Sequence, residues 1–391
     1  EAATPDTTPT SAGRVPGATP AARRWTVLPD ARAADAAPPA GRATDAVPSA
    51  RGPRPIALPP ARRILCWQVV LVLAAVAVGR PWPLAVALGG TAAVLLAVSA
   101  IRVRRTWLST LLARWLRLLL RRRSYQVPTA DRPRALLAWL APGARIRTVE
   151  LGGAPAAVVS RPEELVAVLR PDRATARDLA RIALAEALLP DADGAAPRLA
   201  LRLVLHRGPR QEQLRGWLAL RALRDVDAAA DEALRVALGN ASRRLLRRVR
   251  RTDLDLVPLT EAELLGTVPA LTHVGAGRDV LRERWRNWRA GAITQVGLRL
   301  SGPTVRRADR VAALDRLLAA VPEVATTVVL AADTPELAGV LRLAANTPEA
   351  VDAAADRLAV LGPAFGVRLD RLDGRHGPAV AVSLLIGGDL A

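Results

Sequence analysis

The sequence contains no lysine and no methionine, and it has one cysteine, Cys66. Without lysine, the chain cannot form a phosphate-binding loop of the GxxxxGK[ST] type, in which the lysine contacts the nucleotide phosphates. With one cysteine, it cannot form a disulfide or a thiolate metal site within one chain. The three histidines, His206, His273 and His376, lie far apart in the sequence, and none is beside another ligand at metal spacing. We therefore interpret them as satisfied or surface histidines.

Acidic residues are also missing from a long segment, because no Asp or Glu occurs between Asp45 and Asp131. The two longest apolar runs, 64–79 and 81–101, lie in this gap. At about 1.5 Å per helical residue each run can cross a hydrocarbon core of about 30 Å, the first only just. The connection between them is too short to hold a domain. We therefore predict a transmembrane helical hairpin, with a buried hairpin inside a soluble protein as the alternative.

Arginine supplies every cation of the net charge of +20, and its distribution predicts the topology. The connection holds Arg80 alone, whereas arginines crowd both outer flanks, and cytoplasmic flanks carry such an excess. We predict a multi-pass protein of the inner (cytoplasmic) membrane with both termini in the cytoplasm and with anionic lipids as partners. The predicted membrane-interface residues are Trp67, Trp82, Trp107, Trp115, Arg102, Arg104, Arg105, Arg121, Arg122 and Arg123.

The chain divides into four parts by composition. Residues 1–60 are rich in Pro, Ala, Thr and Arg and cannot bury enough apolar surface to fold, so we predict a disordered cytoplasmic arm. The transmembrane hairpin occupies 61–106. In 107–124, leucines at helical spacing oppose arginines, which predicts an interfacial amphipathic helix. A third span is the alternative there, but it would place Arg114 and Arg117 inside the bilayer at high cost.

Residues 125–391 have the pattern of a cytoplasmic mixed α/β (α+β) domain. Predicted strands are 145–151, 156–160, 198–206, 292–300, 323–331, 337–345, 366–372 and 379–387. Predicted helices are 161–170, 174–189, roughly 211–251, 305–321 and 347–362, and Thr260 with Glu263 forms a capping box that opens another. We expect strand 198–206 at a sheet edge. Near the C-terminus, strand-helix-strand occurs twice with direct strand pairing in between, which suggests a ferredoxin-like or related α+β sandwich.

Asp253 and Asp255 are weak candidates for a metal site. Two carboxylates one residue apart on an extended segment can hold a divalent cation against a diphosphate, as in many nucleotide-sugar transferases. The same spacing recurs at Asp191 and Asp193, which indicates that such pairs arise from composition. No Ser/His/Asp order and no HExxH motif is present. We therefore predict a non-enzymatic protein without catalytic residues, metal or cofactor.

Cations alternate with indoles in the segment 284–289. Its candidate partner-binding residues are Trp285, Trp288, Arg284, Arg286 and Arg289. One interpretation is a protein interface, because Trp and Arg are the commonest hot-spot residues. Another is a helix whose two Trp residues pack into the core while the arginines face water. Nucleic acid, with bases stacked on the indoles, is the least favoured.

This layout resembles the EccE component of type VII (ESX) secretion systems. The shared features are a Pro/Ala-rich arm, two closely spaced spans and a basic amphipathic segment that leads into an α/β domain. In addition, 279–300 looks like the stretch of that family in which a Trp/Arg-rich helix runs into a strand. The resemblance covers roughly residue 61 to the C-terminus and includes no catalytic signature.

The resemblance implies a membrane subunit that helps to assemble and stabilise a secretion complex beside EccB-, EccC- and EccD-like subunits, with the EccC-like ATPase supplying energy. It also implies a soluble domain similar to a glycosyltransferase fold that has lost its catalytic groups, with Asp253 and Asp255 as relics. Two alternatives stay open. One is a membrane-anchored, metal-dependent glycosyltransferase that uses these two residues. The other is a membrane-tethered module that binds nucleic acid or a regulator through the Arg/Trp segment.

Overall fold

The computed structural model describes residues 61–103, 106–172, 175–185, 188–189, 197–225, 230–304, 307–332, 336–386 and 388. The arm predicted at 1–60 lies outside the described residues, as do the predicted interface residues Arg104 and Arg105.

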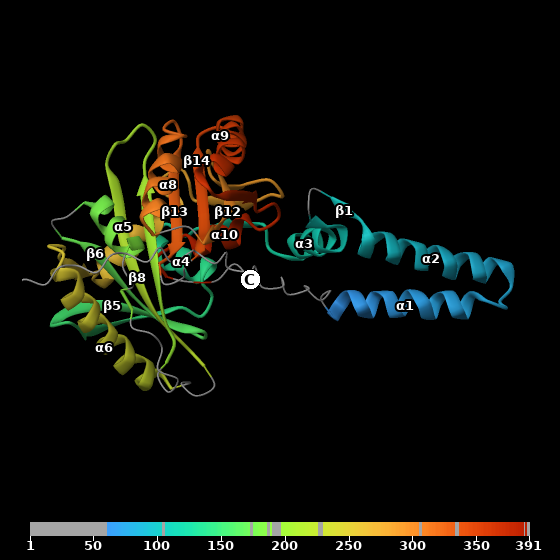
Figure 1. Cartoon of the computed structure of the whole chain (residues 1–391), viewed down its shortest axis with the longest axis horizontal. Coiled ribbons are helices and arrows are strands. Elements are labelled where there is room, and N and C mark those ends of the chain that lie inside the picture. Colours follow the sequence, from blue (N-terminus) through green and yellow to red (C-terminus); the bar gives the residue numbers. More distant parts are fainter. Residues whose placement is uncertain are drawn as a thin grey trace, which may run out of the picture. The chain divides into compact units, whose positions relative to one another are not determined.

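The described chain begins with two apolar helices. α1 spans Ala61–Ala77 and α2 spans Trp82–Ala100, and the two lie side by side (Figure 1). A short pairing of β1 (Arg102–Val103) with β2 (Thr106–Trp107) then leads into α3 (Leu108–Leu120). The helices predicted for the two apolar runs and for the amphipathic segment are therefore present.

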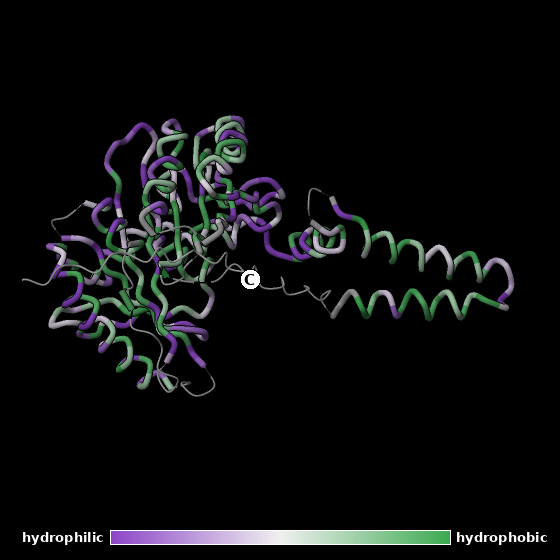
Figure 2. Tube along the Cα trace, viewed as in Figure 1, coloured by the Kyte–Doolittle hydropathy of each residue, from purple (hydrophilic) through white to green (hydrophobic). Residues whose placement is uncertain are grey.

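Most large apolar side chains of α1 and α2 face outward, and Figure 2 shows hydrophobic residues along both helices. Among the described helices, α2 alone is long and apolar enough to cross a membrane, and 11% of this stretch is buried. The apolar part of α1, Ile64–Ala77, is shorter. Large exposed side chains on the two helices include Ile64, Leu65, Trp67, Leu71, Val72, Trp82, Leu84, Val86, Val94 and Leu96. Soluble proteins rarely expose a continuous apolar patch, so the surface of these two helices differs from that of helices packed in a core.

Beyond α3, the chain folds around one sheet of thirteen strands. The strand order is β3-β10-β11-β12-β14-β13-β7-β8-β6-β5-β4, with β15 also paired to β12 and β9 to β6. All these pairings are antiparallel. The strands are β3 Ser124–Gln126, β4 Arg145–Leu151, β5 Ala154–Arg161, β6 Glu164–Pro171, β7 Leu199–Arg207, β8 Leu214–Leu223, β9 Leu256–Pro258, β10 Val280–Glu283, β11 Trp288–Ala290, β12 Ile293–Thr304, β13 Ala325–Ala331, β14 Glu336–Ala345 and β15 Arg368–Arg371. The helices are α4 Arg132–Leu140, α5 Ala176–Ala185, α6 Asp231–Arg250, α7 Glu261–Thr272, α8 Arg307–Ala319, α9 Pro348–Leu361, the 3-10 helix Gly362–Phe365 and α10 His376–Val382.

The sheet contains the same unit twice. In the first half, β6-α5-β7-β8-α6-β9, the strands lie in the order β9-β6-β8-β7. In the second half, β12-α8-β13-β14-α9-β15, the order is β15-β12-β14-β13. Both are the βαββαβ order of a ferredoxin-like unit. The expectation for the C-terminal region is therefore confirmed, whereas the repeat of this unit in the first half was not predicted.

The two halves join where the equivalent strands β7 and β13 pair antiparallel, with Val204 opposite Val329. Each half follows a hairpin, β4-β5 or β10-β11, and precedes a helix, α7 or α10. Because equivalent strands pair antiparallel, an approximate twofold axis relates the halves. Their helices α5, α6, α8 and α9 pack on one face of the sheet, and α4, α7 and α10 pack on the other.

Several predicted elements are wrong, and the cause is burial. The segment 161–170, predicted as a helix, is mostly β6, whose first six residues are buried. A strand covered on both faces shows a continuous apolar run that resembles a buried helix. The same reason explains β8, which occupies the beginning of the predicted helix 211–251 before α6 starts. Strand 198–206 is not at an edge, because β7 lies between β8 and β13.

The C-terminal strand predicted at 379–387 is also wrong. Most of this segment belongs to α10 and the turn after it. Its apolar residues are buried on all sides, between α4 and the sheet. The capping box of Thr260 and Glu263 at the start of α7 is confirmed, as is the N-cap of α9 at Thr347, whose side chain accepts from the N–H of Ala350.

Candidate functional site

The Trp/Arg segment forms the tip of the β10-β11 hairpin. Its four-residue turn closes where the N–H of Arg284 donates to the carbonyl of Asn287 at 2.8 Å. The helix predicted here is therefore wrong, and the helix-into-strand pattern of the resemblance becomes a hairpin that runs into β12. The strands alternate buried and exposed side chains, a period of two that is typical of a sheet.

Trp288 lies in the core. Its relative exposure is 0%, and it packs with the apolar cluster beneath α4, α7 and α10. Trp288 therefore cannot contact a partner in the folded protein, and the core interpretation holds for this residue. The hairpin separates it from Trp285, which lies in the turn and is partly exposed.

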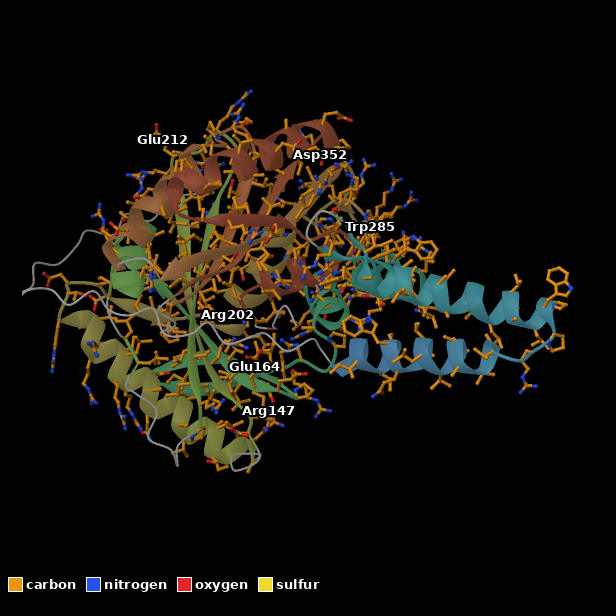
Figure 3. The ribbon with its side chains drawn as sticks, turned by 45° about the vertical axis from the view of Figure 1, so that its right-hand side comes forward. Arg147, Glu164, Arg202, Glu212, Trp285 and Asp352 are labelled. Atoms are coloured by element: carbon orange, nitrogen blue, oxygen red, sulfur yellow. The ribbon has the colours of Figure 1, made fainter. Side chains whose placement is uncertain are left out.

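Trp285 lies between two arginines in this turn, and Figure 3 marks its position. Arg284 and Arg286 on either side of it are exposed, and Arg289 is half-buried. The carbonyl of Trp285 accepts from the N–H of Gly374 at 2.7 Å, which ties the turn to the loop after β15. We call Arg284, Trp285 and Arg286 the hairpin tip. For these residues the role in partner binding stays a prediction.

Two charged residues hold the hairpin tip in place. Arg371 on β15 donates to the carbonyl of Arg286 at 2.6 Å and to Asp352 on α9 at 2.7 Å. Asp352 also lies 3.8 Å from the guanidinium of Arg286. The tip is thus fixed by β15 and α9 of the second half. A surface that is ordered before binding loses little conformational freedom when a partner docks.

The described membrane-interface candidates lie in α1, α2 and α3 or directly beside them. The guanidinium of Arg102 lies 3.8 Å from the ring centroid of Trp107, a cation–π contact. Trp67, Trp82 and Trp115 are 44%, 78% and 50% exposed. Arg121, Arg122 and Arg123 are exposed as well, and Arg121 lies 3.6 Å from the buried carboxylate of Glu283.

The candidate metal residues lie in an exposed turn after α6. Asp253 has a φ of 56°, and Asp255 is 3.6 Å from Arg250. The carbonyl of Asp255 accepts from the N–H of Asp172 at 3.0 Å, a contact that extends the pairing of β9 with β6. Within the described parts of the chain, no three His, Cys, Asp or Glu residues form a group that could hold a metal ion. Asp255 therefore contributes to the pairing of β9 with β6 through its backbone. Among the described residues, no third metal ligand lies beside the pair.

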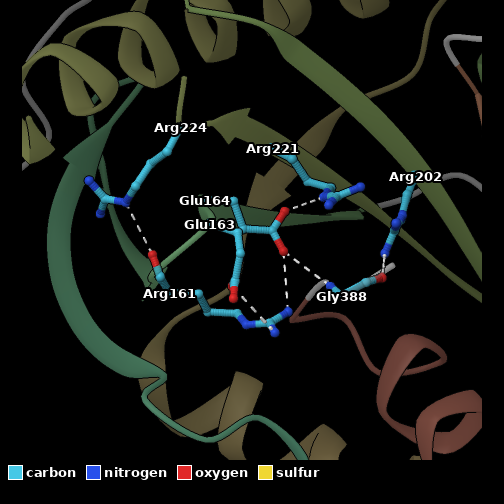
Figure 4. Close-up of polar contacts among 7 residues, drawn as sticks. All are labelled: Arg161, Glu163, Glu164, Arg202, Arg221, Arg224 and Gly388. Atoms are coloured by element: carbon cyan, nitrogen blue, oxygen red, sulfur yellow. Dashed lines mark hydrogen bonds and ion pairs between the residues drawn. The ribbon is translucent and has the colours of Figure 1, made fainter. Parts of the chain in front are cut away.

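Sequence reasoning missed a buried ionic network in the first half (Figure 4). Glu164 is 1% exposed. It accepts a short hydrogen bond from Arg221, and its carboxylate lies 3.3 Å from Arg161 and 3.1 Å from the N–H of Gly388. Arg202 donates to the carbonyl of Gly388 at 2.6 Å. Arg221 is the residue of the sequence that could have indicated this network, because it lies in a mostly apolar segment, β8.

A second buried network lies in the second half. Arg342 is 1% exposed and donates to Gln295 at 2.6 Å, to Thr327 at 3.4 Å and, in a short hydrogen bond, to the carbonyl of Leu271 at the end of α7. Gln295 in turn donates to the carbonyl of Thr272 at 2.7 Å. Burial lowers the pKa of Arg342 to about 9, so it stays charged at pH 7.

The fold brings together two histidines that the sequence separates. The ring centroids of His206 on β7 and His273 after α7 are 5.7 Å apart. Burial, followed by the charge of Arg342, lowers the pKa of His206 to about 4 and that of His273 to about 3. The third histidine, His376, accepts from the N–H of Gly297 at 3.1 Å. Its other ring nitrogen is buried without a hydrogen-bond partner among the described residues and lies 3.7 Å from the carboxylate of Asp373. His376 is therefore only partly satisfied, whereas His206 and His273 form a pair.

A comparison of this sequence with models of known protein families and with curated protein sequences finds no match. The likeness to the EccE family thus rests on the segment layout and on the Trp/Arg stretch.

Proposed function

We propose that this chain is a non-catalytic membrane subunit that helps to assemble and stabilise a type VII protein secretion complex in the cytoplasmic membrane. Its partners would be EccB-, EccC- and EccD-like subunits. The single observation that carries the proposal is the combination of an exposed apolar helix pair with a separate, ordered Trp/Arg surface. The first anchors the chain and the second offers a protein contact.

The membrane part of the proposal rests on the surface of α1 and α2. The core helix of a soluble protein is mostly buried, whereas these helices expose their large apolar side chains. α1 has 17 residues, about 26 Å at 1.5 Å per residue, so it would need some local thinning of the bilayer. The stacking of Arg102 on Trp107 suits the water–lipid boundary, where indole rings concentrate.

The hairpin tip supports protein contact better than nucleic-acid binding. A single-stranded nucleic acid is usually bound by several stacking aromatic side chains along a basic groove. Here Trp288 is buried and only Trp285 remains at the surface. One anchoring indole between arginines is instead the usual centre of a protein hot spot. If the chain binds nucleic acid and this binding weakens steeply as the salt concentration rises, the nucleic-acid-binding alternative would be favoured.

The non-enzymatic part rests on the setting of Asp253 and Asp255. In open α/β folds, ligands bind outside the carboxyl ends of parallel strands, whereas the described strands pair antiparallel throughout. The Asp pair also lies in a surface turn beside Arg250. The descent from a glycosyltransferase that the resemblance implies remains part of this proposal, with Asp253 and Asp255 as relics.

The test compares two variants of the full chain purified from the membrane. Trp285→Ala should leave thermal stability nearly unchanged and weaken co-purification with the partner subunits. A hot-spot loss of about 2 kcal/mol corresponds to roughly thirtyfold in affinity. Val236→Ala, which also truncates an exposed apolar side chain (55% exposed), is the control and should leave assembly intact.

The second variant, Asp253→Asn with Asp255→Asn, removes both carboxylates and keeps side-chain size. It should fold, assemble and support secretion. A variant that folds and assembles but abolishes function would overturn the non-enzymatic proposal. If a folded Trp285→Ala protein co-purifies normally with the partner subunits, the hairpin tip is not part of the interface.

A further inference from the structure

The two buried networks occupy equivalent places in the two halves of the sheet. On β8, Arg221 lies opposite Val166, two residues beyond Glu164. On β14, Arg342 lies opposite Gly297, two residues beyond Gln295. The repeat therefore keeps the arginine and replaces its carboxylate partner with a neutral carboxamide.

Among the described residues, this replacement leaves the buried positive charge of Arg342 without a counter-charge. The three hydrogen-bond acceptors of Arg342 are the side chains of Gln295 and Thr327 and the carbonyl of Leu271, and all are neutral. An unpaired buried charge is costly, and its field extends far in a medium of low dielectric constant. The field of Arg342 therefore acts on whatever occupies the space beside it.

A row of paired residues connects Arg342 to a pocket. Arg342 lies opposite Thr327, Thr327 opposite His206, and His206 opposite Arg215. Directly paired residues of antiparallel strands point to the same face of a sheet. This face is the one covered by α7. His206 is also hydrogen-bonded to Thr327, at 2.9 Å, so the row places its imidazole between the buried charge and the pocket.

The pocket has a volume of about 530 Å³ and lies between α7 and strands β7 and β8. Its lining includes both imidazoles, the guanidinium of Arg215, the carboxamides of Gln211 and Gln213, and the indole of Trp217. Arg170 and Glu263 also line it, and they form an ion pair with each other at 3.2 Å. Since these two charges offset each other, Arg215 in the lining and Arg342 in the row leave an excess of positive charge beside the pocket.

The histidines fit an anion better than a metal ion. The depressed pKa values of His206 and His273 keep both rings neutral at pH 7, and a neutral imidazole can donate one N–H. The cations that disfavour protonation of these rings also disfavour a bound divalent cation. Arg215 and the two carboxamides add donors, so the polar groups of the pocket suit the oxygens of a carboxylate or phosphate.

We propose that this pocket binds a small organic anion through a carboxylate or phosphate group, with Arg215, His206 and His273 as its direct contacts and Arg342 as the buried charge that attracts it. The volume falls in the range typical of pockets for small organic molecules, larger than a bare ion requires. The wall formed by Trp217 and Leu271 would cover the apolar part of such a ligand. The inference does not depend on the proposed role in secretion.

The experiment uses the full chain in nanodiscs of neutral lipid, so that no lipid head group competes, and follows binding by calorimetry at pH 7. The probes are inorganic phosphate and citrate, which separate the two oxyanion classes. We expect one of them to bind, and Arg215→Gln to weaken it about tenfold or more, the loss expected for a hydrogen bond to a charged group.

Gln295→Glu tests the buried charge, because it supplies the counter-charge that Arg221 has in the first half. It should weaken anion binding without touching the pocket lining. Arg247→Gln on α6 makes the same change in net charge on an exposed surface and should leave affinity unchanged. If Gln295→Glu does not fold, Arg215→Gln still decides the test.

Three outcomes would overturn the proposal. One is the absence of binding by either anion. Another is an equal effect of Arg247→Gln and Arg215→Gln, which would indicate non-specific attraction by a basic protein. The third is tighter binding of Zn²⁺ than of the anions, which would make the two histidines metal ligands.

Discussion

The indole of Trp285 lies directly against Gly374, where a residue without a side chain leaves room for the ring. A Cβ atom on Gly374 would lie 2.6 Å from Cζ3 of Trp285. Gly374 has a φ of 71°, in the region that favours glycine, and its N–H donates to the carbonyl of Trp285. The position of the hairpin tip is therefore set by a glycine almost ninety residues away in the sequence.

Gly374→Ala should lower the thermal unfolding temperature and displace the indole of Trp285. Two costs add here: a left-handed φ for alanine, about 1–2 kcal/mol, and the overlap with the ring. Gly366→Ala is the control, because Gly366 has a φ of 72° and nothing within 4 Å of the added Cβ. The unfolding temperature should fall further in Gly374→Ala than in Gly366→Ala, and this difference measures the overlap with the ring of Trp285. Equal losses in the two variants would show that the contact has no energetic weight.

Trp288→Ala should strongly destabilise the domain that contains the thirteen-stranded sheet, whereas Trp285→Ala should not. Removal of a fully buried Trp side chain leaves a cavity and costs about 3–5 kcal/mol. Thermal unfolding of the full chain, followed by circular dichroism, measures both variants. A stable Trp288→Ala protein would contradict the burial of this side chain.

Acidification should destabilise the protein through His206 and His273. Their folded pKa values, about 4 and about 3, lie below the ordinary value of 6.5. Between pH 6.5 and about 4, the unfolded chain therefore binds protons that the folded chain does not, and stability falls as pH falls. For His206 the total loss is on the order of 3 kcal/mol. His206→Gln should flatten the unfolding temperature between pH 6.5 and 4; an unchanged pH profile would argue against a buried neutral imidazole.

Glu164→Gln should cost about 3–5 kcal/mol, since it leaves Arg221 buried without its carboxylate. Glu163→Gln is the matched control. Glu163 is adjacent in sequence, but its side chain is 67% exposed and its ion pair with Arg161 spans 3.6 Å. A surface pair of this kind is worth less than about 1 kcal/mol. Comparable unfolding temperatures for the two variants would mean that the network of Figure 4 is not a source of stability.

The proposed topology predicts where reporter fusions are active. Fusions after Gly17 and after Ser124 should be active as cytoplasmic reporters, and a fusion after Arg80 should be active outside. The reason is the arginine excess on both outer flanks of the hairpin. Opposite compartments for Gly17 and Ser124 would rule out two spans and would favour α3 or another segment as a further crossing.

Elements with a clear period were predictable from sequence. The second half has the order strand-helix-strand-strand-helix-strand, with a proline and a threonine cap at the start of α9, and this order already pointed to a ferredoxin-like unit. The first half has the same topology, but β6 and β8 are buried on both faces, so their residues give no alternation. An apolar run of this length can be a buried strand or a buried helix, and for β6 and β8 the pairing with neighbouring strands decides between them.

The sequence by itself determined the apolar helix pair, the amphipathic α3 and the capped helices, because each follows from local spacing and from residues a few positions apart. Only the tertiary structure decided that Trp288 is buried while Trp285 is exposed, that His206 meets His273, and that Arg342 lacks the carboxylate that Arg221 has. The first depends on the register of the β10-β11 hairpin, the second on the contact between the end of α7 and β7, and the third on the pairing of β12 with β14. Pairing register selects which side chains share a face, and a shift of one residue would exchange the core for the surface.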